Sequence, residues 1–90
     1  MTAGPHLYAV YLGGDPAPGR LTEDHEVVLV VADGVPAARR RARQKWAGVS
    51  PPHVDAVRVI DVVDGFAVSL SATTEPETAS VDLTYEPEIP

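Results

Sequence analysis

HEVVLVVADGVPAARRRARQKWA, residues 25–47, joins an apolar strand to a basic helix. The run of large aliphatic side chains predicts a strand over residues 25–32. A helix is expected over residues 36–47, because Asp33 or a neighbour can cap its first turn and a proline is tolerated there. Gly48 is a good C-terminal stop for that helix.

The flanking sequence predicts three more strands. LYAVYL, residues 7–12, is rich in branched and aromatic side chains, and Gly13-Gly14 follows it. VDAVRVIDVV, residues 54–63, and FAVSL, residues 66–70, flank Asp64-Gly65, a strong hairpin signal. The predicted order is β-β-α-β-β. The expected fold is therefore α+β, a four-stranded, mostly antiparallel sheet with one helix on one face.

Charge and composition separate a body from a tail. The 90 residues hold 7 Lys and Arg against 13 Asp and Glu, a net charge of −6. We expect one small α+β domain over residues 1–71. Residues 72–90 are expected to form an acidic, proline-containing tail that is disordered or that adds an edge strand through VDLTY, residues 81–85.

The same composition bears on several classes of protein. A nucleic-acid-binding domain usually has an excess of basic over acidic residues, whereas this chain has a net negative charge. The absence of cysteine excludes a disulfide scaffold and any Cys-ligated metal. The apolar run at residues 7–12 is too short for a signal core or a membrane span. A cytoplasmic protein without membrane association is expected.

The predicted sheet has more apolar surface than one helix can cover. Residues 7–12 and 25–32 are apolar on both faces, whereas a strand that faces water should alternate. A patch of that size rarely stays exposed. We therefore predict a homodimer through the sheet face, with a monomer covered by its own tail as the alternative.

Several polar residues are expected at one end of the sheet. A strand–helix–strand crossover usually joins parallel strands, which places His25 and His53 at the same edge. The helix end at Trp46 and the Gly13-Gly14 pair arrive at that edge as well, and the last strand is expected to end there.

This end is the candidate ligand-binding site. Its residues are Gly13, Gly14, Glu23, His25, Glu26, Trp46, His53 and Asp55. Two imidazoles with a carboxylate suit a divalent ion or acid–base chemistry. Structural roles are nevertheless favoured for both histidines, core packing for Trp46, and turn geometry over an anion nest for the glycine pair. No metal site is predicted, and the cofactor and catalytic residues stay unassigned.

The helix offers a second candidate surface. Arg39, Arg40 and Arg43 could contact phosphates of a polyanion. Clustered charges on a helix more often form a solvated face, so nucleic acid is not the favoured partner.

Four segments carry a family resemblance: Tyr11-Leu12-Gly13-Gly14, Glu23-Asp24-His25-Glu26, Lys45-Trp46-Ala47-Gly48 and His53-Val54-Asp55. Their order and spacing over residues 7–70 resemble a bacterial family known as domain of unknown function 1543. The resemblance implies that members contain one or two copies of this module per chain. Two copies in one chain would fit a module that pairs with itself. The resemblance implies no activity, substrate or catalytic residue. The arginine-rich helix and the acidic tail look atypical for it.

Three functions follow from these observations. The first is a non-enzymatic interaction or ligand-binding module that dimerises, with its protein or small-molecule partner unidentified. The second is a small enzyme or accessory protein that uses the His25/His53 end, with or without a metal. The third is polyanion binding by the helix. The sequence favours a non-enzymatic protein but does not decide whether the protein is an enzyme.

Overall fold

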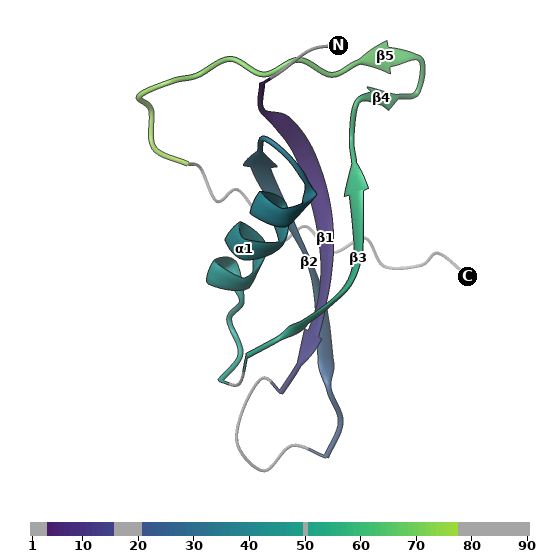
Figure 1. Ribbon diagram of the computed structural model, residues 1–90, viewed down its shortest axis with the longest axis vertical. Coiled ribbons are helices and arrows are strands. Elements are labelled where there is room, and N and C mark those ends of the chain that lie inside the picture. The colour runs from purple at the N-terminus through teal and green to yellow at the C-terminus, as the bar shows by residue number, and fades with distance from the viewer. Residues whose placement is uncertain (1–3, 16–20, 50, 78–90) are drawn as a thin grey trace, which may run out of the picture.

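The computed structural model describes residues 4–15, 21–49 and 51–77. Its elements are strand β1 (His6–Gly14), strand β2 (Asp24–Ala32), helix α1 (Val35–Lys45), strand β3 (His53–Val59), strand β4 (Val62–Val63) and strand β5 (Phe66–Ala67) (Figure 1). The predicted β-β-α-β order is confirmed, but the strand expected over residues 54–63 is divided in two. The extra strand considered for residues 81–85 lies outside the described residues.

Strand β1 is the centre of the main sheet. Within the described residues this sheet has three strands in the order β2-β1-β3, and β1 is antiparallel to both neighbours (Figure 1). Strands β2 and β3 therefore run parallel to each other, separated by β1. As expected, the two strands begin at the same end, where His25 and His53 both pair with Gly13.

The predicted four-stranded sheet is wrong. Strands β4 and β5 pair with each other and form a separate two-stranded sheet. The Ile60 amide donates a hydrogen bond of 2.8 Å to the carbonyl of Leu7, next to His6, where β1 begins among the described residues. The hairpin consequently lies at the end of the sheet away from His53, so the final strand does not return to the histidines (Figure 1).

The hairpin turn itself is confirmed. Asp64 and Gly65 both have positive φ, 53° and 83°. Positive φ at both central residues is typical of the type I′ turn, whose twist matches that of antiparallel strands. The two-residue turn sets Val63 opposite Phe66.

Helix α1 begins and ends close to the predicted positions. Gly34 is its N-cap and no side chain caps it, so the expected capping by Asp33 is not seen. Pro36 lies in the first turn, where a missing N–H costs nothing. Lys45 donates a hydrogen bond of 2.7 Å from Nζ to the Leu29 carbonyl, on an edge strand of the sheet.

The core lies between α1 and one face of the main sheet. Its buried residues are Tyr8, Val10, Leu12, Val30, Ala32, Ala38 and Ala42. Ala38 and Ala42 are one helical turn apart and fully buried, which allows the helix backbone to approach the strands closely. Val35, at the start of the helix, and Val49, beyond its end, are both exposed and do not join this core.

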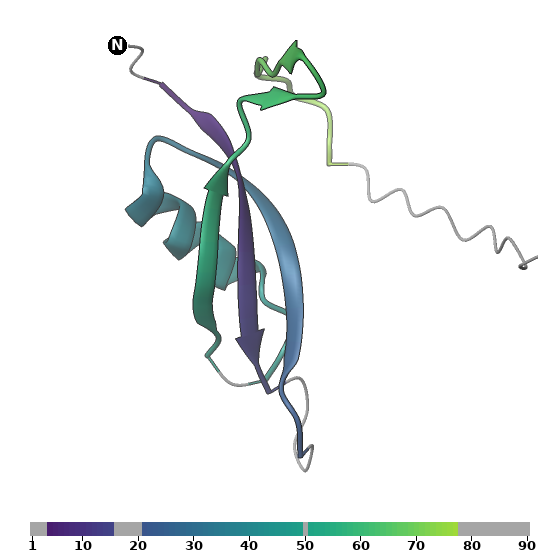
Figure 2. The ribbon, with the colours of Figure 1, turned by 90° about the vertical axis from the view of Figure 1, so that its right-hand side faces the viewer.

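The opposite face of the main sheet is apolar and uncovered by the described residues. We call it the open face; it comprises Leu7, Ala9, Tyr11, Val27, Leu29 and Val31. The helix lies on the other side of the sheet (Figure 2). Alternation along β1 and β2 explains the two faces, because successive side chains point to opposite sides.

Candidate functional site

Two histidines meet over a glycine at one end of the sheet. Gly13 of β1 pairs with His25 of β2 on one side and with His53 of β3 on the other. Residues paired directly across an antiparallel sheet have side chains on the same face. Both imidazoles therefore lie at the end of the open face.

The missing side chain of Gly13 provides the space in which the imidazoles converge. A Cβ atom at this position would lie 2.7 Å from His53 Nε2 and 2.9 Å from His25 Nε2. Gly13 and Gly14 both belong to β1, and neither has a positive φ. The turn-geometry interpretation of this pair is therefore wrong, and their place in the ladder leaves no loop for an anion nest.

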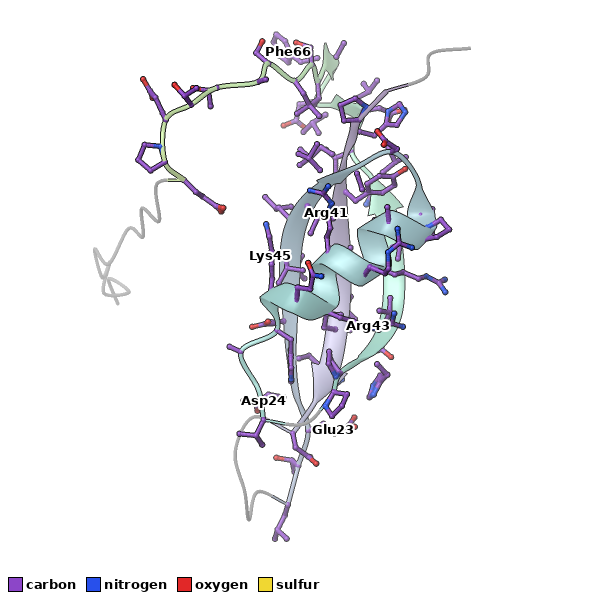
Figure 3. The ribbon with its side chains drawn as sticks, turned by 60° about the vertical axis from the view of Figure 1, so that its left-hand side comes forward. Glu23, Asp24, Arg41, Arg43, Lys45 and Phe66 are labelled. Carbon is purple, nitrogen blue, oxygen red and sulfur yellow. The ribbon has the colours of Figure 1, made fainter. Side chains whose placement is uncertain are left out.

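Two carboxylates flank the imidazoles. His53 Nε2 lies 3.3 Å from an Asp55 oxygen and 3.7 Å from Glu23 Oε1, and His25 Nε2 lies 3.7 Å from the other Asp55 oxygen. Glu23 is at the end of the molecule opposite Phe66 (Figure 3). We call Glu23, His25, His53 and Asp55 the histidine cluster.

A β-bulge positions Asp55. Tyr11 pairs with Ala56 and Leu12 pairs with Val54, so Asp55 has no partner of its own on β1. The extra residue changes the alternation of β3, so that Asp55 lies beside the imidazoles while Val54 and Val57 both pack against the core. Bulges commonly re-aim a side chain in this way.

Sequence reasoning missed Tyr11 as a member of this region. Its ring stacks on His25, with centroids 5.2 Å apart and planes 11° from parallel. The tyrosine ring therefore covers one face of the His25 imidazole. Strand alternation was the available signal, since it places Tyr11 and Gly13 on the same face.

The remaining predicted residues lie on the helix side of the sheet. Trp46 is half-buried and packs against the core, with its indole next to Gly14. Glu26 pairs with Leu12, whose side chain is in the core, so it also lies on that side. Its buried Oε1 has no hydrogen-bond partner among the described residues. The predicted set thus divides into two groups, and the sheet separates them.

The two groups differ in chemistry. The histidine cluster combines nitrogen and oxygen donors at a solvent-exposed end of the sheet and can accept protons or hold a cation. Trp46 and Gly14 form an apolar contact, in agreement with core packing as the role of the indole.

The arginines predicted to bind polyanions do share one surface. Arg39, Arg40 and Arg43 line a shallow depression on α1 together with Val35 and Pro36. All three arginines are exposed. Figure 3 shows the side chains of Arg43 and Lys45 leaving the helix in different directions.

Fold and site together define a small α+β module with one open sheet face and a histidine–carboxylate cluster at its end. The chain belongs to the family described as Domain of Unknown Function (DUF1543), whose model matches residues 20–70. The match begins after β1, so it covers less than the resemblance over residues 7–70. No curated protein and no solved structure matched the chain. Within the described residues, no helix is long and apolar enough to cross a lipid bilayer.

Proposed function

We propose that the protein is a non-enzymatic interaction module whose copies pair through the open face. The observation that carries this proposal is the exposure of large apolar side chains of β2 on the open face: Leu29 is 53% exposed and Val27 is 61% exposed. Apolar patches of this kind typically mark interaction surfaces. Arg58, which pairs with Ala9, and His25 give the patch a polar rim, the usual anatomy of a protein interface.

The hairpin supports a second copy as the partner. Residues 62–70, which we call the arm, carry Val62, Val63, Phe66 and Leu70 as exposed apolar side chains. A two-stranded hairpin is marginally stable by itself in water. The chain therefore holds two apolar surfaces that its own described residues leave uncovered.

The arm of one copy is placed so that it can pack against the open face of another copy. Ala9 of the open face, Arg58 and residues 59–64 line a hollow between sheet and arm. The arm extends beyond the sheet on the side away from the helix (Figure 2). In a two-fold dimer the same patch serves both subunits, so each arm would pack against the sheet of the other copy.

Leu29→Glu should abolish pairing. The variant places a charge on the open face, beside Ala9 of the central strand, and we expect the dissociation constant of the dimer to rise at least about 10-fold, equivalent to roughly 1.4 kcal/mol. Sedimentation equilibrium on the untagged full chain should give twice the 9.5 kDa chain mass for the wild type and the monomer mass for the variant.

Val35→Glu is the matched control for this test. Val35 is an exposed apolar residue on α1, outside the open face. This variant should remain a dimer, and circular dichroism should show that both variants stay folded. A wild-type monomer at about 100 µM, or equal disruption by both variants, contradicts the proposal.

Phe66→Ser tests the arm. Phe66 is 75% exposed within its own chain, so its replacement should change the stability of the monomeric Leu29→Glu background by no more than about 0.5 kcal/mol. In the wild-type background it should weaken dimerisation. A loss of monomer stability with unchanged association would show instead that Phe66 packs within its own chain.

A further inference from the structure

We propose that Glu23, His25 and His53 form a binding site for one divalent transition-metal ion, with Zn²⁺ as the reference ion. This inference goes beyond pairing and does not depend on it. It assigns no reaction to the site. The sequence favoured structural roles for the histidines, whereas the argument for a metal rests on how the folded chain brings their donor atoms together.

The donor atoms already lie close together. One donor atom each from Glu23, His25 and His53 can be chosen so that all three lie within 4.8 Å of one another. Donors bound to zinc at about 2.0–2.1 Å in tetrahedral geometry are about 3.3 Å apart. The required contraction is small. The side chains of His25 and His53 are 40% and 50% exposed, so neither is locked in place by surrounding atoms.

The backbone is adapted to this convergence. A central strand flanked by two histidines would normally carry a side chain between them, and Gly13 leaves that space empty. Both imidazoles present Nε2 toward it, and Tyr11 stacks on the ring of His25. Gly13 belongs to β1 and has no positive φ. The space needed by the two imidazoles, and not an unusual backbone conformation, therefore explains a glycine at this position.

The chemistry of the donors selects the class of ion. Imidazole nitrogen suits Zn²⁺, Co²⁺, Ni²⁺ and Cu²⁺, while Mg²⁺ and Ca²⁺ prefer oxygen ligands alone. Two histidines and one carboxylate leave coordination positions for water, which the exposure of the cluster admits. The Asp55 carboxylate lies near both imidazoles and adds a second negative charge that attracts a cation.

Calorimetric titration of the untagged full chain with ZnCl₂, in a buffer that does not bind metal, tests the site. We expect one ion per chain. His25→Ala and His53→Ala should each weaken binding by more than the roughly 10–100-fold that follows loss of an outer-shell partner. The absorption spectrum of the Co²⁺ complex should report nitrogen ligation and lose its intensity in both variants.

His6→Ala is the matched control, because His6 belongs to β1 but pairs with Ala32 at the other end of the strand. It should bind zinc like the wild type. Equal losses in all three histidine variants, or a wild type that binds no better than His25→Ala, would overturn the proposal and leave the cluster as a surface network of histidines and carboxylates.

Gly13→Ala tests whether zinc affinity depends on the space between the imidazoles or only on the presence of the three ligands. It retains every ligand but places a methyl group between the imidazoles. We expect a loss of zinc affinity of at least about 10-fold, with folding checked by circular dichroism. Wild-type affinity in a folded Gly13→Ala variant would refute the proposed geometry; if this variant does not fold, the histidine variants decide.

The monomeric Leu29→Glu variant keeps the metal question apart from pairing. Leu29 belongs to the open face but contributes no donor to the cluster. This variant should bind zinc like the wild type. Metal binding without dimerisation, or dimerisation without metal binding, would therefore identify which of the two proposals has failed.

Discussion

Leu12→Ala should lower the free energy of unfolding by about 2–5 kcal/mol, the range for a large aliphatic side chain removed from a core. Leu12 lies on the central strand, is fully buried and is among the largest fully buried side chains of the described core. A chain of this size has a small total stability, so the variant is expected to be partly unfolded at 37 °C. Urea denaturation at a fixed protein concentration measures the change.

Leu21→Ala is the control with the same substitution chemistry. Leu21 is fully exposed, at 101% of its reference area, so its truncation should change stability by no more than about 0.5 kcal/mol. Similar effects at the two positions would show that Leu12 does not lie in the core. Denaturation of both variants in the Leu29→Glu background removes any contribution from pairing.

Trp46→Ala should cost about 2–3 kcal/mol, below the roughly 3–5 kcal/mol of a fully buried tryptophan. The indole is half-buried, packs against the core and lies beside Gly14 and Gly48. A Cβ atom on Gly48 would overlap the indole, so the ring position depends on that glycine. Thermal unfolding followed by circular dichroism measures the loss.

Zinc titration of the same variant distinguishes the two roles considered for Trp46. Because the sheet separates the indole from the histidine cluster, Trp46→Ala should bind zinc with wild-type affinity once folded. Unchanged stability together with altered ligand binding would instead assign the indole to a ligand site.

The histidine cluster shows how far the sequence alone can go. The crossover rule was enough to place His25 and His53 at one end of the sheet, because parallel strands begin at the same edge. It did not show that Gly13 lies between them, since strand pairing order depends on contacts far apart in the chain. It also missed the bulge at Asp55, which is a property of register and not of local composition.

The hairpin shows a different limit. Asp64-Gly65 correctly predicted a two-residue turn, because positive φ at both positions is a local preference. The expectation that the returning strand extends the main sheet was wrong, because among the described residues β1 starts at His6 and β4 and β5 pair with each other. Local signals set the turn, and strand lengths set where the hairpin lies.

The sequence by itself determined the order of the elements, the turn at Asp64-Gly65 and the excess of apolar strand surface over what one helix can cover. Each follows from periodicity or backbone preference within a few residues. Only the tertiary structure decided that β1 is central, that the indole and the imidazoles lie on opposite sides of the sheet, and that the arm lies apart. Those features depend on register and pairing between distant segments, which side-chain patterns within one segment do not specify.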